Sequence, residues 1–344
     1  MTDERHQMID AWIKAKIGLP GHCALTRESI EAWQADRLRR TLAHMVAHSP
    51  FYSSLLSGIS LDKDILSISD ACKLPFTDED DLTRDGHRMV CTSASEVSRI
   101  VTLPTSGTTG APKRIFFTEA DQELMIDYIH HGLAIMAGAE DVFLVLMPCE
   151  RPGSVGDLVR IGLERGGVRV IPRGILPFDG SRDAEMLDMM EQEGISSLLA
   201  TASAALRLSE KSRGRLRLRS VLLSAEYVSS EARAAIEANW GCLVYEHYGM
   251  TEMGLGGAMA CAAREGYHPR EADLLFEIVD PQTGAVLPDG EWGEVVFTTL
   301  TREAMPFVRY RTGDRGRFLP GQCPCGSVLK RLDRIGDRKA LKGY

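Results

Sequence analysis

The first part of the chain has the hydrophobic spacing of amphipathic helices. Residues 28–50 read ESIEAWQADRLRRTLAHMVAHSP, and the larger apolar side chains fall near one face of a helix. These side chains are Ile30, Trp33, Leu38, Leu42 and Met45. Pro50 lacks the N–H that a continuing helix needs, so the run ends there. We predict that residues 1–95 form a helical N-terminal region.

From about residue 96 the pattern changes to short apolar runs that alternate with amphipathic segments. The runs are DVFLVLMP (141–148), VRVIP (168–172), SSLLATA (196–202), SVLLSAE (220–226) and CLVYEHYG (242–249). Helical segments that end at glycine, such as 183–194 and 230–241, separate several of them. Buried strands joined by crossover helices predict a largely parallel sheet. We therefore place an α/β core at residues 96–271.

The pattern changes again near residue 272. The stretch LLFEIVDPQTGAVLPDGEWGEVVFTTL alternates as strand, turn and strand, with turns at DPQTG and LPDGEWG. This pattern predicts an antiparallel β subdomain over residues 272–333. The expected fold is α/β, with mixed, mostly parallel sheets flanked by helices and a smaller antiparallel subdomain.

Length and charge narrow the class of protein. The chain has 344 residues, which exceeds the size of one compact core and predicts subdomains that share an interface. The net charge is −8, with acidic and basic residues interleaved. Nucleic-acid binding rests on clustered lysine and arginine, so no nucleic-acid partner is expected.

The sequence gives no sign of a membrane-bound protein. No window approaches 18 uncharged apolar residues, and the N-terminus MTDERHQMIDAWIKAK lacks an apolar signal core. We predict a cytoplasmic protein without a membrane partner. Its eight cysteines are then expected to stay reduced, so a cysteine cluster indicates metal rather than disulfides.

A dense group of small hydroxyl residues precedes a lysine in LPTSGTTGAPKRI, residues 103–115. In a glycine-rich turn, backbone N–H groups can converge on an anion, and serine or threonine hydroxyls add donors. Lys113 adds a charge suited to phosphate oxygens. The order of residues is not that of a Walker loop. The residues alone leave a phosphate cradle and a solvated loop equally open.

The motif resembles the phosphate loop of the adenylate-forming (AMP-binding) superfamily, which includes acyl-coenzyme A synthetases, peptide-synthetase adenylation domains and luciferases. The quoted match is TSGTTGAPK, and EHYGMTEMG (246–254) and VRYRTGD (308–314) match further family motifs in the same order. The stretches TLAHMVAHSPFYSSLL, LPFTDEDDL and VDPQTGAVLPDGEWGEVVFTTLTREAMPFVRYRTGD are similar to the phenylacetate–coenzyme A ligase branch. The resemblance extends from about residue 35 to the end.

The resemblance implies a large N-terminal adenylate-forming domain and a reaction. That reaction activates a carboxylic acid, most often an aromatic one in this branch, with ATP to an acyl-adenylate and releases pyrophosphate. A coenzyme A thioester could follow with help from a partner. The expected ligands are therefore ATP, Mg²⁺ and a small carboxylic acid, with coenzyme A, or a carrier or partner protein, as further candidates.

The resemblance also implies roles for single residues. The residues expected at the β- and γ-phosphates are Thr105, Ser106, Gly107, Thr108, Thr109, Gly110 and Lys113. Lys113, Thr251 and Glu252 are the expected catalytic residues, with Glu252 holding Mg²⁺ and Thr251 near the α-phosphate. Ala225, Glu226 and Tyr248 are expected at the adenine and Asp314 at the ribose, and Gly249 and Met250 are further expected ATP-binding residues.

Cysteine and histidine form a second candidate cluster. Its members are Cys261, His268, Cys323 and Cys325. Three thiols and an imidazole suit a closed tetrahedral Zn²⁺ site, although the Cys-x-Cys spacing is not the familiar one. Reduced cysteines in two turns are the alternative. The similarity of this arrangement to some members of the ligase branch favours a structural zinc.

The end of the sequence departs from the family pattern. Family members continue past a glycine-arginine-x-aspartate hinge into a C-terminal domain with a catalytic lysine. Here the chain ends RIGDRKALKGY, and Asp337 stands where the pattern has arginine. Arg334 or Arg338 are the candidate replacements, so residues 334–344 are expected to be a truncated hinge without that domain.

Two hypotheses follow for the function. The first is an enzyme that makes an acyl-adenylate, which the intact Lys113, Tyr248, Glu252 and Asp314 favour. The second is a degenerate module that binds a nucleotide or aryl acid without turnover, which the altered hinge and the missing domain favour. The intact residues make the enzyme the preferred hypothesis.

Overall fold

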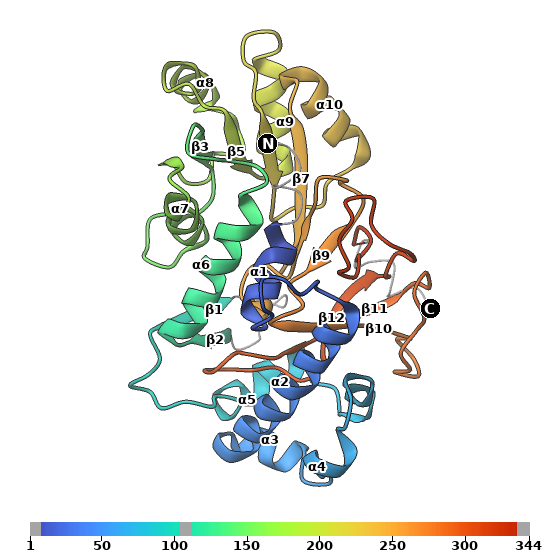
Figure 1. Cartoon of the computed structure of the whole chain (residues 1–344). Helices are drawn as coiled ribbons and strands as arrows, with labels where there is room; N and C mark the ends of the chain where they lie inside the picture. Colours follow the sequence, from blue (N-terminus) through green and yellow to red (C-terminus); the bar gives the residue numbers. More distant parts are fainter. Residues whose placement is uncertain (1–7, 104–111, 336–344) are drawn as a thin grey trace. The chain divides into compact units, whose positions relative to one another are not determined.

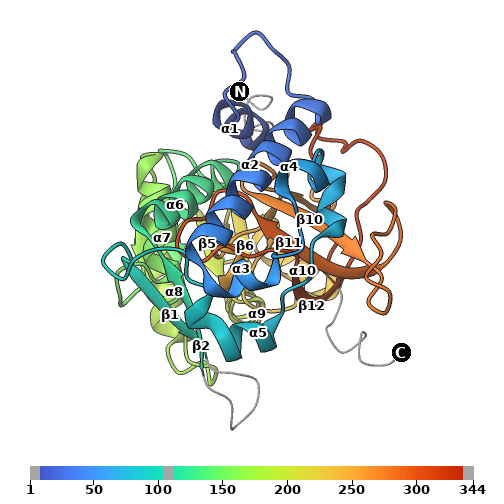
Figure 2. The same ribbon diagram turned by 90° about the horizontal axis from the view of Figure 1, so that it is seen from below.

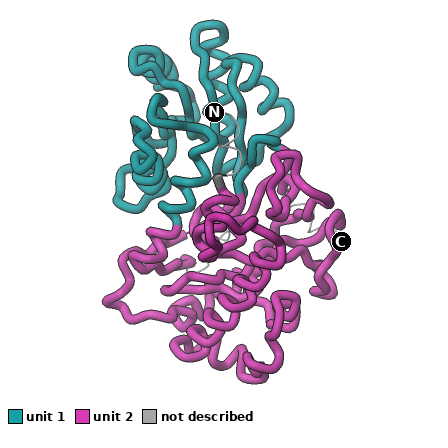
Figure 3. The backbone as a smooth tube through the Cα atoms, in the orientation of Figure 1, with its two compact units in different colours: residues 1–8, 125–248, 259–264 teal, residues 9–124, 249–258, 265–344 magenta. Residues whose placement is uncertain are grey.

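The computed structural model describes residues 8–103 and 112–335. Its backbone divides into two compact units, shown in Figure 3. Unit 1 comprises residues 1–8, 125–248 and 259–264, and unit 2 comprises 9–124, 249–258 and 265–344. The subdomain bounds expected from the sequence stay a prediction.

Unit 1 is built on a parallel sheet whose strand order is β4-β3-β5-β6-β7. Figure 1 labels β3, β5 and β7 of this sheet. The elements of this region are α6 (Glu119–Leu133), β3 (Val142–Val145), α7 (Val155–Arg165), β4 (Arg169–Pro172), α8 (Asp183–Gln192), β5 (Ser197–Ala200), α9 (Ala202–Lys211), β6 (Ser220–Leu223), α10 (Ser230–Trp240) and β7 (Leu243–Tyr248). The predicted alternation of strands and crossover helices is confirmed.

The core of unit 1 explains why this alternation folds. Side chains of α8, α9 and α10 pack with Leu144, Leu198 and Val221 in one apolar cluster. Trp240 is fully buried there, and its indole N–H donates to Ser212 Oγ at 2.9 Å. Burial of this kind contributes roughly 25 cal/mol for each Å² of apolar surface, so the helices hold the strands in place.

Unit 2 contains the N-terminal helices and the antiparallel strands. Its elements, with β8 at its boundary, are α1 (Met8–Lys16), α2 (Arg27–His48), α3 (Pro50–Leu55), α4 (Leu61–Asp64), η2 (Ile68–Lys73), α5 (Glu79–Asp85), η3 (Gly86–Arg88), β1 (Arg99–Leu103), β2 (Lys113–Phe117), η4 (Thr251–Met253), β8 (Ala258–Ala260), β9 (Tyr267–Pro269), β10 (Leu274–Val279), β11 (Gly293–Thr299) and β12 (Tyr310–Gly316). Strands β10, β11 and β12 form an antiparallel sheet, and β1 pairs with β2 in a separate antiparallel pair. The predicted fold class is confirmed.

Helix α2 lies alongside β10 and β11, as Figure 2 shows. It begins with a capping box between Thr26 and Ser29. Four residues of its predicted apolar face, Ile30, Leu38, Leu42 and Met45, are buried, whereas Trp33 is half-buried. Thr41 Oγ1 donates to the Leu300 carbonyl at 2.7 Å. Pro50 ends α2 and is also the first residue of α3, a position where its missing N–H costs nothing.

Among the described residues, no helix combines the length and apolar character that a membrane crossing requires.

Candidate active site

The predicted site residues fall into several groups. The phosphate-loop residues Thr105 to Gly110 lie outside the described residues. Lys113, Gly249 to Glu252, Asp314 and Arg334 belong to unit 2, whereas Ala225, Glu226 and Tyr248 belong to unit 1. We describe the groups of each unit in turn.

Lys113 and Glu252 are brought together, although 139 positions separate them. Lys113 Nζ donates to Glu252 Oε1 at 3.2 Å. The Glu252 side chain is 2% exposed and that of Lys113 13%. A buried carboxylate is stable only with a partner, and Lys113 supplies it. Glu79 of α5 adds a second carboxylate, with its Oε1 at 3.1 Å from Lys113 Nζ.

The turn that carries Glu252 is closed by its own backbone. The N–H groups of Met253 and Leu255 donate to the Met250 carbonyl at 3.1 and 3.0 Å. Gly249 lies against the far side of the turn, where a Cβ would stand 1.8 Å from the Leu255 carbonyl oxygen. No side chain fits there, so this glycine is required by the close approach of the backbone whatever ligand binds.

Asp314 lies in β12, and its residue is 6% exposed. Its N–H donates to Thr312 Oγ1 at 3.0 Å. Gly313, with φ of 70°, donates its N–H to Glu294 Oε1 at 3.1 Å. The pairing of β11 with β12 shifts register between Glu294 and Val296. Such an irregularity re-aims a strand's side chains, as at many functional sites.

In unit 1, the nucleotide candidates follow the carboxyl ends of neighbouring strands. Strands β6 and β7 are parallel, with Leu223 opposite Glu246. Ala225 follows β6 with φ of 67°, a conformation that costs a non-glycine residue energy. Tyr248 is the last residue of β7 and is 7% exposed. In open α/β sheets, ligands bind at this edge.

The backbone beside Ala225 is supported by a strand-to-strand contact. His247 Nε2 of β7 lies 2.7 Å from Ser224 Oγ. Burial lowers the pKa of the His247 imidazole to about 4, so the ring is neutral near pH 7. A neutral ring can form a hydrogen bond with the Ser224 hydroxyl and needs no counterion.

Two weaker candidates already have structural partners. Glu226 accepts hydrogen bonds from Ser203 N at 2.8 Å and Ser203 Oγ at 2.9 Å, in the first turn of α9. A carboxylate at that position satisfies a free helix N–H. Arg334 donates its backbone N–H to Asp333 Oδ1 at 2.8 Å.

The histidine and cysteines of unit 2 form a cluster. The ligand atoms of His268, Cys323 and Cys325 lie within 4.8 Å of one another, and His268 Nε2 is 3.3 Å from Cys325 Sγ. The other ring nitrogen, Nδ1, donates to the Lys330 carbonyl at 3.0 Å. That hydrogen bond orients the ring, and in the neutral tautomer with the proton on Nδ1 the other nitrogen, Nε2, is available to a metal ion. Cys261, a buried cysteine, belongs to unit 1.

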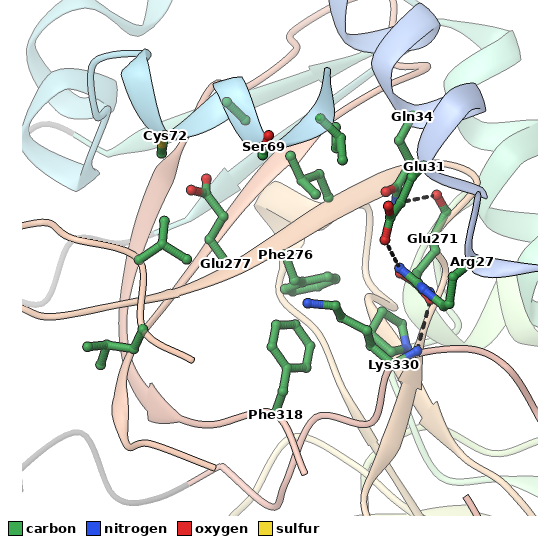
Figure 4. Close-up of a pocket in the computed structure, with 16 residues that line it drawn as sticks. Arg27, Glu31, Gln34, Ser69, Cys72, Glu271, Phe276, Glu277, Phe318 and Lys330 are labelled. Carbon is green, nitrogen blue, oxygen red and sulfur yellow. Dashed lines mark hydrogen bonds and ion pairs between the residues drawn. The ribbon is translucent and has the colours of Figure 1, made fainter. Parts of the chain in front are cut away.

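Unit 2 also has a pocket of about 370 Å³, shown in Figure 4. The predicted site residues are not among those that line it. At one end, Glu271 accepts from Arg27 Nη1 at 2.6 Å and from Lys330 N at 3.0 Å. The rings of Phe276 and Phe318 form part of its apolar wall. At this end of the pocket, the polar groups therefore bind one another.

Sequence reasoning missed several charged residues around Glu252. Glu79 belongs to an acidic run, Asp78 to Asp81, that reads as a helix start, and α5 begins there. Arg270 and Arg302 also contact the backbone of the Glu252 turn. Nothing in their local sequence indicates this, because the contacts join distant parts of the chain.

Comparisons with known proteins identify the family of this chain. The family model "AMP-binding enzyme" matches residues 33–300. Phenylacetate-coenzyme A ligase of Thermus thermophilus is 32% identical over 334 residues, which cover 93% of this chain and 73% of that protein. The ligase of the same name from Escherichia coli is 31% identical over 325 residues, covering 90% and 71%.

The fold has relatives among solved structures. The structure of 2-hydroxyisobutyryl-CoA ligase in complex with 2-HIB-AMP and CoA has a TM-score of 0.81 at 23% sequence identity, covering 91% of this chain and 69% of that chain. The family model and the sequence relatives define the class of protein, an AMP-forming acid–coenzyme A ligase. The chain belongs to the AMP-binding enzyme family. The predicted resemblance to the phenylacetate–coenzyme A ligase branch is confirmed.

Proposed function

We propose that this chain uses ATP to activate an aromatic carboxylic acid, releases pyrophosphate and then transfers the acyl group to coenzyme A. The aromatic acid rests on the relatives, which are phenylacetate-coenzyme A ligases. The proposal includes a carrier or partner protein as a further candidate participant in the transfer. The observation that carries the adenylation step is the buried Lys113–Glu252 pair.

The pair suits the charge problem of adenylation. A carboxylate must approach the α-phosphorus of ATP, so two anions have to be held together. We assign Lys113 to the phosphate oxygens and Thr251 to the neighbourhood of the α-phosphate. Mg²⁺ prefers carboxylate oxygen, so the buried Glu252 carboxylate fits a Mg²⁺ ion that neutralises the phosphates.

We assign the remaining nucleotide contacts by the same proposal. The proposed β- and γ-phosphate residues are Thr105, Ser106, Gly107, Thr108, Thr109 and Gly110. The proposed adenine-side residues are Ala225, Glu226 and Tyr248, with Gly249 and Met250 as further ATP-binding residues. Asp314 would accept hydrogen bonds from the ribose hydroxyls, and Arg334 is the candidate hinge arginine. The burial of Tyr248 at the end of β7 and of Asp314 in β12 supports rigid positioning.

We also propose a structural Zn²⁺ bound by Cys261, His268, Cys323 and Cys325. The three ligands of unit 2 fit the ion, because thiolate sulfur and imidazole nitrogen are its preferred donors and the His268 ring is already oriented. Cys261 is the proposed fourth ligand, seven positions before His268 in sequence.

ATP–pyrophosphate exchange with a panel of aryl and fatty acids tests the proposed reaction. We expect exchange that depends on an aryl acid and falls by at least about 100-fold in Lys113→Ala and Glu252→Gln, because each removes charge stabilisation at the reacting phosphates. The matched control is Lys211→Ala, which removes a lysine from the buried carboxylate of Asp183, 2.8 Å away.

The exchange assay distinguishes the hypothesis of an enzyme from that of a binding module. Exchange that survives both substitutions would refute the assigned roles. Exchange that is absent with every acid, while calorimetry still detects ATP binding, would favour a nucleotide-binding module without turnover.

A further inference from the structure

Two buried arginines donate hydrogen bonds to backbone carbonyls at the end of η4, the turn that carries Glu252. Arg302 Nη1 donates to the Glu252 carbonyl, and Arg270 Nη2 donates to the Met253 carbonyl. Both arginines belong to unit 2, as does the turn. Arg270 lies between β9 and β10, and Arg302 follows β11, so separate segments hold consecutive residues of one turn.

The η4 turn needs hydrogen bonds from groups outside it. The last carbonyls of any helical turn lack N–H donors within it, and this helix is only three residues long. The chain then passes through Gly254 and Leu255 with φ of 80° and 69°. The left-handed conformation of Leu255 costs on the order of 1 kcal/mol. Guanidinium–carbonyl hydrogen bonds are charge-assisted and stronger than neutral ones, so they can offset this cost.

Arg302 also contacts the strand that carries Lys113. Its guanidinium lies over the Phe117 ring, 4.3 Å from the centroid. Phe117 is four residues after Lys113 in β2, so their side chains leave the strand on the same face. One buried side chain therefore contacts both the strand of Lys113 and the turn of Glu252.

Burial of this guanidinium is costly. The Arg302 residue is 8% exposed, and within the described part of the chain its Nη2 has no hydrogen-bond partner. Burial lowers the pKa of Arg302 to about 10, which still leaves it charged near pH 7. An apolar residue would fill the same space without the desolvation cost, but it could not donate the hydrogen bond to the Glu252 carbonyl.

We propose that Arg270 and Arg302 are positioning residues for the metal-binding carboxylate of Glu252. By fixing the backbone of η4, they hold that carboxylate against Lys113 and toward a Mg²⁺–ATP substrate. Neither arginine is assigned to a reacting atom. The inference rests on the proposed function, because Mg²⁺–ATP is its ligand.

The test compares Arg302→Lys with Arg309→Lys. Arg309 is likewise buried and lies over a phenylalanine ring, 4.0 Å from the centroid of Phe76, but it pairs with Glu277 rather than with the turn. Both variants keep the charge and lose a buried guanidinium. ATP affinity is measured by calorimetry with and without Mg²⁺, together with thermal unfolding.

We expect Arg302→Lys to reduce the Mg²⁺-dependent gain in ATP affinity by roughly 10- to 100-fold, the usual effect of losing a group that orients a metal ligand. Arg309→Lys is expected to lose stability and keep the full gain. In a Glu252→Gln background, Arg302→Lys should add little further effect, because both changes act through one carboxylate.

Amide hydrogen exchange of residues 250–255 gives a readout that needs no turnover. Faster exchange there in Arg302→Lys, and not in Arg309→Lys, supports the proposal. An unchanged Mg²⁺ gain and unchanged exchange in Arg302→Lys would overturn it, even if thermal stability falls. A wild-type chain that binds ATP without any Mg²⁺ gain would instead refute the proposed function and, with it, the metal role of Glu252.

Discussion

Lys113 contacts Glu79 as well as Glu252, at 3.1 and 3.2 Å. The Glu79 side chain is 46% exposed, so solvent screens its interaction more than that of the buried Glu252. Glu79 is nevertheless a negative charge at the lysine assigned to the phosphates of ATP. On this assignment, we expect Glu79 to compete with the nucleotide for the Lys113 ammonium group.

Replacing Glu79 is expected to strengthen ATP binding. We expect Glu79→Gln to lower the KM for ATP by roughly 2- to 5-fold, the range that an exposed ion pair contributes. The effect should shrink in high salt, which screens exposed charges. Pyrophosphate exchange at varied ATP and salt concentrations measures both. The control is Asp80→Asn, the same charge change at the next, exposed residue. A higher KM in Glu79→Gln would mean that Glu79 positions Lys113 instead.

At the scale of elements, the pairing of β6 with β7 determines the charge state of the His247 ring. The ring lies against Ser224 across the parallel pair and is neutral, because burial lowers its pKa to about 4. In the unfolded chain the same ring has a pKa near 6.5. Between these values the unfolded chain binds a proton that the folded chain does not.

This difference gives a defined pH dependence. The contribution of the neutral His247 ring to the free energy of unfolding is fully present above about pH 6.5. It is lost as the pH falls toward 4, because the unfolded chain binds the proton more readily than the folded chain. We expect the free energy of unfolding to drop between pH 7 and 5 by on the order of 1 kcal/mol more in the wild type than in His247→Gln. Urea unfolding at the two pH values measures this. Equal drops in both proteins would contradict the buried, neutral imidazole.

At the scale of the whole chain, the cysteine–histidine cluster closes a long loop. His268 and Cys323 are 55 positions apart in sequence, yet their ligand atoms lie within 4.8 Å. A metal ion that bridges such positions stabilises the folded chain, because the unfolded chain lacks the assembled site.

Removal of zinc is therefore expected to destabilise the protein. We expect about one equivalent of zinc in the purified chain, and a melting temperature that falls by at least about 3 °C after chelation or in Cys325→Ser. Cys72→Ser, at an exposed cysteine outside the cluster, is the control. Less than half an equivalent of zinc by elemental analysis, with unchanged stability in Cys325→Ser, would exclude the zinc site.

The amino-acid sequence by itself determined the elements, the fold class and the order of the motifs. The apolar spacing of residues 28–50 predicted α2, and the short runs from 141 to 249 predicted the parallel strands, because hydrophobic periodicity is a local property. The motifs carry Lys113, Glu252 and Asp314 in recognisable surroundings, so their roles could be proposed before any geometry was known.

Only the tertiary structure decided which other side chains surround those residues. Glu79 at Lys113, and Arg302 and Arg270 at the Glu252 turn, are contacts between positions far apart in the chain. The need for glycine at 249 likewise comes from the Leu255 carbonyl that approaches it. Such contacts depend on how elements pack, and no pattern within one segment specifies which charge meets which carbonyl across the core.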